Sequence, residues 1–303
     1  MTRVALSGIF YPVAILRYFE AALQNRPDVE LVSVGSFTGN WIPWSGGVEL
    51  PEKYALPPTI PLAKHLWSVG SMNPSFLYQD DRLKDIDVWI QVDAGFHFQG
   101  KVPAKVMVHV ATDPHCLEYS QQRIFADYFF NMQKFYSKPG DSYLPYCASK
   151  YHHYPMNVEK EYDVCLVGLQ YTQRNELMAA LRREGLKVFY TLGLGPDEYR
   201  EAYNKSRVAV SWSSMQDLIA RVFEAGAMDL PLVCNRVPDL PLHFVETYDY
   251  QGFDTVDEAV WNVKMLLADP DLSKTMANNL RNKVENLHTY DHRIQQIFDT
   301  IGI

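Results

Sequence analysis

The residues that most directly suggest chemistry are an arginine and a glutamate three positions apart, Arg221 and Glu224, in the first turns of an expected helix over residues 219–228. This helix follows a strand, and helix N-termini attract anions through their unbonded N–H groups and dipole. An arginine there can pair with a diphosphate, and a carboxylate one turn later can accept hydrogen bonds from a ribose diol. The spacing alone favours a surface ion pair over a ligand site. If the pair binds a ligand, both side chains should face a cleft rather than the core.

A second anion contact is expected near Gly168, which ends an expected strand at 163–167, and Arg174, in the first turn of the helix that follows. A glycine lets the backbone approach a phosphate closely, and the arginine adds positive charge. The alternative is a tight turn followed by a solvated arginine.

The first half of the chain has polar residues after two expected strands. Asp113 and His115 follow the strand at 105–110, and Asp93 and His97 follow the strand at 87–92. Because ligands bind at the carboxyl ends of parallel strands, we expect Asp113 or His115 to position an acceptor hydroxyl or the transferred sugar. A histidine in such a place is also often structural. We assign no metal site, because no carboxylate cluster or D-x-D motif stands out as one.

Aromatic residues crowd a proline-rich stretch at 36–80, among them Trp41 and Trp44. Such side chains stack on sugars, nucleobases or apolar acceptors, so we place Trp41 and Trp44 on the acceptor side. The alternative is a small satellite core beneath a long loop.

The elements that would position these residues alternate regularly between strand and helix. Apolar strand patterns separated by helices of about ten residues predict β-α-β crossovers with mostly parallel sheets. We therefore predict an α/β fold of two Rossmann-like, doubly wound domains facing a cleft. The predicted division is an N-terminal domain at 1–155 with the loop-rich insertion at 36–80, a C-terminal domain at 156–288 and a terminal helix at 289–303.

Length and composition agree with two globular domains. The chain has 303 residues, 47% of them hydrophobic and 21% charged, and a net charge of −8, which argues against a broad basic surface for nonspecific nucleic-acid binding. No apolar run approaches the length of a membrane span, so we expect a cytoplasmic protein.

Several segments together resemble a known family. The segment from Asp217 to Ala227, followed by the strand at 232–234, resembles the donor-binding helix of GT-B glycosyltransferases, most closely the CgeB-like, spore-maturation type family related to the glycosyl transferases group 1. Further matches occur in the family's order at Asp113-Pro114, Tyr143-Leu144-Pro145-Tyr146, Tyr162 to Gly168, His288-Thr289-Tyr290 and Arg293.

This resemblance implies a GT-B fold in which the second domain binds the nucleotide and the first binds the acceptor. It implies retention of anomeric configuration, no obligatory metal and a terminal helix that returns to the first domain. In the related E-x7-E motif Glu224 is the second carboxylate, whereas Gln216 stands at the first position. Gln216 can still bond a sugar hydroxyl, and Asp217 can substitute if the backbone presents it, so both are candidate donor contacts.

The expected activity is therefore transfer of a sugar from a nucleotide-diphosphate sugar, a substrate rather than a cofactor, to a hydroxyl acceptor such as a saccharide, protein, small molecule or modified nucleic acid. Two alternatives stay open: a GT-B epimerase or phosphorylase, and a non-catalytic nucleotide-sugar or carbohydrate-binding protein, which Gln216 favours. A Rossmann dehydrogenase is disfavoured because neither domain opens with G-x-G-x-x-G.

Overall fold

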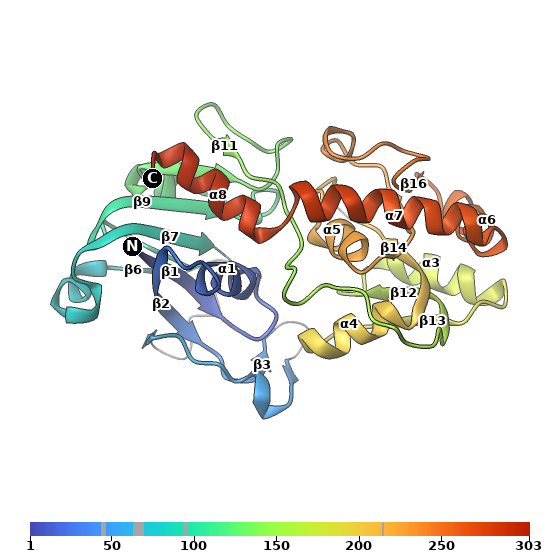
Figure 1. Cartoon of the computed structure of the whole chain (residues 1–303), viewed down its shortest axis with the longest axis horizontal. Helices are drawn as coiled ribbons and strands as arrows, with labels where there is room; N and C mark the ends of the chain where they lie inside the picture. Colours follow the sequence, from blue (N-terminus) through green and yellow to red (C-terminus); the bar gives the residue numbers. More distant parts are fainter. Residues whose placement is uncertain (44–46, 63–69, 94–95, 214) are drawn as a thin grey trace. The chain divides into compact units, whose positions relative to one another are not determined.

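The structure is a computed structural model that describes residues 1–43, 47–62, 70–93, 96–213 and 215–303. The chain divides into two compact units (Figure 1). The first comprises Met1–Pro145 together with Asp291–Ile303, and the second comprises Tyr146–Tyr290. The division falls inside the proline-rich stretch at 143–157.

The first unit is built on a seven-stranded parallel sheet with the order β11-β10-β9-β7-β1-β2-β5. Its interior strands are nearly continuous apolar runs, as expected for strands covered on both faces. The chain builds outward from β1 through β2 to β5, then returns to the other side of β1 with β7, so the strand order reverses between β1 and β7. The strands are β1 Thr2–Phe10, β2 Val29–Phe37, β5 Ile60–Leu62, β7 Ile86–Asp93, β9 Ala104–Ala111, β10 Tyr128–Asn131 and β11 Ser142–Tyr143, with helices α1 Ile15–Gln24 and α2 Ser120–Phe125.

The second unit has a five-stranded parallel sheet with the order β13-β12-β14-β15-β16. Here the strand order reverses between β12 and β14. Helices α3 and α6 pack on one face over a core that includes Leu166, Leu177, Val210 and Val263. The elements are β12 Tyr162–Val167, α3 Thr172–Arg183, β13 Val188–Thr191, α4 Pro196–Asn204, β14 Ser206–Ser211, α5 Ala220–Ala227, β15 Leu232–Asn235, β16 Gln251–Phe253, α6 Val256–Ala268 and α7 Pro270–Leu287.

Short elements fill the stretch at 36–80 and the neighbouring loops. The pair β3–β4 is antiparallel, β6 and β8 are parallel, and the remaining pieces are 3-10 turns. Their bounds are β3 Trp41–Ile42, β4 Val48–Glu49, η1 Glu52–Tyr54, β6 Gly70–Met72, η2 Pro74–Gln79, η3 Asp81–Leu83, β8 Phe96–Phe98 and, in the second unit, η4 Leu240–Leu242.

The C-terminal helix α8, Tyr290–Ile301, packs within the first unit, where Figure 1 shows it in red beside the N-terminal sheet. Arg293 Nε donates to the carbonyl of Pro145 at 2.6 Å, and Gln296 Nε2 donates to the carbonyl of Tyr143 at 2.8 Å. Its apolar face, Ile294, Ile297 and Phe298, is buried. A side-chain hydrogen bond and a cation–π contact from Arg26 also hold this helix.

The fold class predicted from the alternation of elements is confirmed: the chain is α/β, with two doubly wound parallel sheets. Sequence analysis missed the shortest strands. The strand β16 has only three residues and Gly252 at its centre, so its sequence carries no β-branched alternation to reveal it.

Candidate functional site

Arg221 lies at the carboxyl end of β12, next to the point where the strand order of the second sheet reverses. From the first turn of α5, its Nε and Nη2 both donate to the carbonyl of Val167, at 3.0 and 2.6 Å. The third nitrogen, Nη1, is buried and has no hydrogen-bond partner among the residues that the structure describes. The guanidinium therefore has two nitrogens committed to a carbonyl and one left for a ligand, which corrects the picture of an arginine wholly available to a diphosphate.

Arg174 brings a second buried guanidinium to the same strand end. Its Nε donates to the carbonyl of Trp212 and its Nη1 to the carbonyl of Leu169, both at 2.8 Å. Burial, and then the positive charge of Arg221, lower the pKa of Arg174 to about 10. Within the described part of the chain, no salt bridge neutralises either guanidinium.

Gly168 lies between the two guanidiniums. A Cβ built at this residue would overlap Nη2 of Arg221 and lie 3.4 Å from Nη1 of Arg174. Its φ of +150° is also one that other residues rarely adopt. Glycine is therefore required at this position for the arginines to come together over the backbone, and the expected tight turn and the expected cationic site occur in one place.

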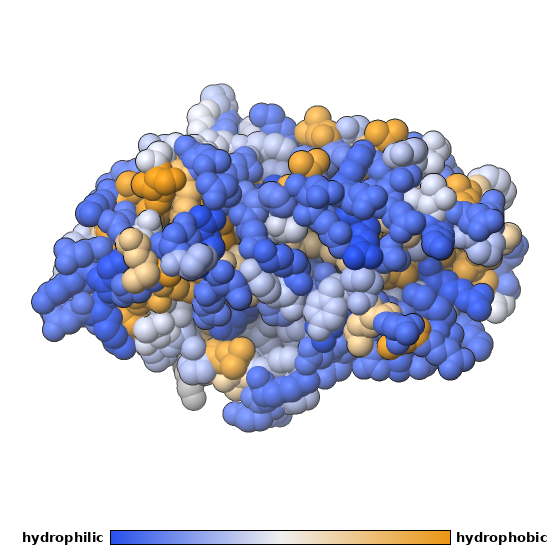
Figure 2. All heavy atoms as spheres, viewed as in Figure 1, coloured by the Kyte–Doolittle hydropathy of each residue, from blue (hydrophilic) through white to orange (hydrophobic). Residues whose placement is uncertain are grey.

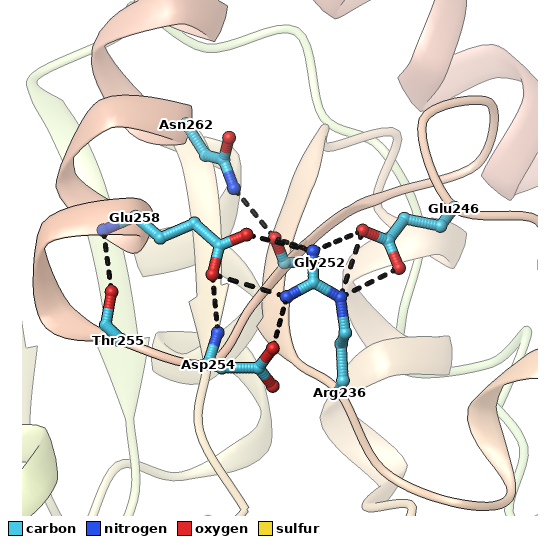
Figure 3. Close-up of polar contacts among 7 residues, drawn as sticks. All are labelled: Arg236, Glu246, Gly252, Asp254, Thr255, Glu258 and Asn262. Carbon is cyan, nitrogen blue, oxygen red and sulfur yellow. Dashed lines mark hydrogen bonds and ion pairs between the residues drawn. The ribbon is translucent and has the colours of Figure 1, made fainter.

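Arg236, another arginine of this unit, differs from Arg174 and Arg221 because carboxylates neutralise its guanidinium. Arg236, just after β15, is bound by three carboxylates: Glu246 at 2.6 Å, Asp254 at 2.7 Å and Glu258 at 2.9 Å (Figure 3). These bonds raise the pKa of Arg236, and its Nη2 also donates to the carbonyl of Gly252. Arg236 thus joins the ends of β15 and β16. Its positive charge is neutralised by carboxylates, in contrast to the charges of Arg174 and Arg221.

Glu224 is one turn beyond Arg221 and is buried, with 8% of its surface exposed. The Tyr199 hydroxyl, from α4, donates to its Oε2 at 2.5 Å. Burial raises the pKa of the Glu224 carboxyl, against the lowering effects of the Tyr199 hydrogen bond and the Arg221 charge. The expectation that Glu224 faces an open cleft is therefore wrong for this side chain. Glu224 lies near Arg221, as predicted, but its carboxylate is buried.

His153 approaches the other oxygen of this carboxylate. Its Nε2 lies 3.7 Å from Glu224 Oε1, while its Nδ1 accepts the backbone N–H of Ser149 at 3.1 Å. Burial, and then Arg200, lower the pKa of His153 to about 3, so the ring is neutral near pH 7 and its single proton sits on Nε2. The contact is therefore an N–H directed at the carboxylate and not an ion pair. Neither His153 nor Tyr199 was a sequence candidate, because both approach Glu224 only through the tertiary fold.

The two loop candidates before α5 differ from each other. Gln216 is exposed and adopts a left-handed backbone conformation with a φ of +57°. Asp217 is buried, and the Ser213 hydroxyl donates to its carboxylate. Asn235 holds this loop in place, since its side-chain oxygen accepts the backbone N–H of Ser213 at 2.7 Å. Asp217 thus stabilises the loop, and Gln216 is the residue that the loop presents.

In the first unit, Asp113 and His115 follow β9. The Thr112 hydroxyl donates to Asp113 Oδ2 at 2.6 Å, and Asp113 lines a cavity of about 170 Å³. Potential ligand atoms of Asp113, His115 and Cys116 lie within 4.8 Å of one another, a grouping that the sequence analysis did not assign to a metal.

The remaining acceptor-side candidates are less open. His97 is buried in β8, with Gln122 Nε2 3.3 Å from its Nδ1, and Trp41 is exposed and covers Gly47. Asp93 ends β7, but the description does not extend to its side chain, and Trp44 and Trp67 lie outside the described residues. The small core in this stretch consists of Ile42, Leu50 and Tyr54.

Comparison with solved structures identifies the architecture. An α-glucosyltransferase in complex with UDP and a 13-mer DNA matches over 100% of both chains, with a TM-score of 0.65 and 13% identity. The chain has the GT-B fold. The sucrose-phosphate synthase of Thermosynechococcus elongatus (TM-score 0.61, 13% identity) and the glycosyltransferase AviGT4 of avilamycin A biosynthesis (0.60, 12%) also match over 99% of this chain and 98% and 96% of theirs.

In this GT-B chain, residues 154–299 match the model of a family described as glycosyl transferase-like, which covers just under half of the sequence. The residues matched include Arg174, Arg221 and Glu224. No curated protein matches the sequence. None of the described helices is both long and apolar enough to cross a membrane, and the face in Figure 2 shows hydrophobic residues in separate spots among hydrophilic ones.

Proposed function

We propose that this GT-B protein is a glycosyltransferase that moves a sugar from a nucleotide-diphosphate sugar to a hydroxyl acceptor, retains the anomeric configuration and requires no metal. The observation that carries the proposal is the pair of buried guanidiniums, Arg174 and Arg221, held over Gly168 with no salt bridge to a carboxylate of the described residues. They lie at the strand-order reversal of the second sheet, where open α/β sheets bind ligands.

Two buried guanidiniums with one nearby carboxylate, Glu224, leave an excess of positive charge at this strand end. Such an excess favours an anionic ligand, and a diphosphate, with two adjacent negative groups, is one that two guanidiniums can bind. In the transfer step, the bond from the anomeric carbon to the β-phosphate oxygen breaks and a bond from the acceptor oxygen to that carbon forms. The electron pair leaves with the nucleoside diphosphate, which takes the acceptor proton on the same face. Arg174 and Arg221 stabilise the charge that develops on the leaving group, usually the largest catalytic term.

The other residues have supporting roles in this proposal. The buried Glu224 carboxylate, held by Tyr199, favours the charged form of Arg221, and Gln216 contacts the transferred sugar. Asp113 positions the acceptor hydroxyl. The α-glucosyltransferase has been solved with UDP and with UDP-glucose, and the MnaA protein of S. aureus has been solved with UDP. A uridine nucleotide sugar is therefore the first donor to test. We also propose the CgeB-like group as the subfamily.

Titration with UDP, GDP, ADP, CDP and dTDP sugars tests the donor assignment, because a bound nucleotide raises the melting temperature. We expect one nucleotide series to stabilise the protein and to be released as the diphosphate in the presence of acceptors. No stabilisation by any of them would refute the proposal.

A second candidate function is nucleotide-sugar binding without transfer, or epimerisation of the bound sugar. The observation that favours it is Gln216, a neutral residue where the related motif has a carboxylate. Binding without nucleotide release over a broad acceptor panel would support this alternative.

A further inference from the structure

A cavity of about 170 Å³ lies in the first unit where β1 and β7 end, beside the first turn of α1. Its walls are mainly apolar, with Tyr11, Thr112 and Asp113 as the polar side chains. The apolar lining residues are Ile9, Val13, Ala14, Ile15, Leu16 and Val92. Ile9, Leu16 and Val92 are almost fully buried. The cavity is therefore a mainly apolar space with a few polar groups, one of them a carboxylate.

Its place in the sheet marks it as a ligand site independently of its shape. The strand order reverses between β1 and β7, and ligands of doubly wound sheets bind outside the strand ends at such a reversal. Gly8 makes the local packing possible, since a Cβ there would lie 2.5 Å from the Val92 carbonyl and 3.1 Å from Leu16 Cδ2. A side chain at residue 8 would push Leu16 out of its position in the cavity wall.

Volume and lining together define the chemistry that fits. An apolar cavity of about 150 Å³ accommodates a benzene ring, so this one holds a single six-membered ring. A saccharide ring would bring several hydroxyls against Ile9, Val13 and Val92, whose side chains cannot bond them, and a buried hydroxyl without a partner weakens binding. The Asp113 carboxylate disfavours an anionic group but accepts a hydrogen bond from a hydroxyl.

We propose that this cavity is the acceptor subsite and that it takes an aromatic or similarly flat, apolar ring carrying a hydroxyl or hydroxymethyl group, with the hydroxyl at Asp113. The inference rests on the proposed transferase function. It narrows the acceptor from any hydroxyl compound to a ring-borne alcohol whose ring is desolvated on binding, while other parts of the acceptor remain outside the cavity.

Binding can be tested without a donor. Ligand-observed NMR with benzyl alcohol and with glucose, each on the full chain, should give saturation transfer for benzyl alcohol and none for glucose. Val13→Phe, which fills the cavity from its rim, should weaken benzyl alcohol binding at least tenfold, whereas the matched substitution Val245→Phe at an exposed valine of the second unit should leave it unchanged. Equal binding of benzyl alcohol to the wild type and Val13→Phe would overturn the proposal.

Transfer assays then separate this inference from the function on which it rests. With the nucleotide sugar that binds, benzyl alcohol should be glycosylated faster than glucose, and Val13→Phe should lose this transfer while its nucleotide affinity stays within twofold of wild type. If nucleotide binds and glucose is the better acceptor, the acceptor assignment fails and the transferase stands. If no nucleotide binds, the transferase function fails, and the NMR result alone decides the ligand class of the cavity.

Discussion

At the scale of single residues, the proposed donor site depends on which arginines are not neutralised by a salt bridge. Arg236 has three carboxylate partners, whereas Arg174 and Arg221 bond only to carbonyl oxygens and keep their net charge. A bound diphosphate would satisfy Nη1 of Arg221, the nitrogen that is buried without a partner. The proposed site therefore has an excess of positive charge, which an anionic ligand would neutralise.

We expect Arg174→Ala and Arg221→Ala each to lower the affinity for the donor nucleotide by about ten- to a hundredfold, because a hydrogen bond to a charged group contributes about 1.5–3 kcal/mol. Isothermal titration measures this directly. Arg183→Ala, an exposed arginine on the same helix as Arg174, is the control and should bind normally. Unchanged affinity in both site variants would remove the diphosphate from this position.

Glu224→Gln should change stability in a pH-dependent way and lower donor affinity. The folded protein raises the pKa of this carboxyl, so the native state holds its proton to higher pH, and the associated stability is lost as pH rises through the folded value. A charged carboxylate buried in this way costs stability, and a glutamine that keeps the Tyr199 hydrogen bond removes that cost. We expect the melting temperature of Glu224→Gln to gain on that of the wild type as pH rises through the folded pKa of Glu224, with weaker nucleotide binding. A difference in melting temperature that does not change with pH would contradict this.

Sequence analysis could find Arg221, Glu224 and Arg174 because each follows a recognisable strand or begins a helix. It could not find Tyr199 or His153, which are distant in sequence and meet Glu224 only when α4 and the segment before β12 fold against α5. For the same reason, it could not foresee that the Val167 carbonyl occupies two nitrogens of Arg221. The sequence pattern singles out a candidate residue, but tertiary packing decides which of its polar atoms remain able to bind a ligand.

At the scale of elements, the end of β12 is held from two helices. Tyr203 of α4 accepts the Val167 N–H at 3.4 Å, and Arg221 of α5 donates to the Val167 carbonyl. The turn at Gly168 thus follows a residue whose backbone N–H and carbonyl are both hydrogen-bonded. The geometry of the donor site follows from this strand end, and helix propensity contributes little to it.

Gly168→Ala should weaken nucleotide binding about as much as losing an arginine, because the new methyl group would displace the Arg221 guanidinium. The matched control is Gly185→Ala. That glycine also has a positive φ, +81°, but nothing lies within 4 Å of its added Cβ. The control should lose a similar amount of stability from backbone strain and keep its affinity. Equal affinity in the two variants would show that the contact with Arg221 has no role.

Removal of residues 289–303 should destabilise the first unit. Helix α8 buries Ile294, Ile297 and Phe298 there, and Arg293 bonds the Pro145 carbonyl. Hydrogen exchange should then show loss of protection in β1, β2 and β11, whereas α3 and α5, which carry Arg174 and Arg221, should stay protected and the second unit should still bind nucleotide. Loss of protection confined to residues 160–285 would contradict the prediction that this helix stabilises the first unit.

At the scale of the whole molecule, the two units offer opposite charges at equivalent places. Each sheet reverses its strand order once, and a candidate site lies beside each reversal: two guanidiniums in the second unit and a carboxylate beside an apolar cavity in the first. The chain as a whole has a net charge of −8, so the positive potential for a phosphate donor is local to Arg174 and Arg221. Under the proposed function, the anionic donor would bind to the second unit and the neutral acceptor to the first.

Sugar transfer should continue in the presence of a chelator and keep the anomeric configuration of the donor. The two guanidiniums of Arg174 and Arg221 provide the positive charge that a divalent cation would otherwise supply to the leaving diphosphate, so excess EDTA should change the rate by less than about twofold. Proton NMR of the fresh product gives the configuration at the anomeric carbon from its coupling constant. If EDTA abolishes transfer and Mn²⁺ restores it, the arginines do not suffice, and the grouped ligand atoms of Asp113, His115 and Cys116 become the first place to look for the ion.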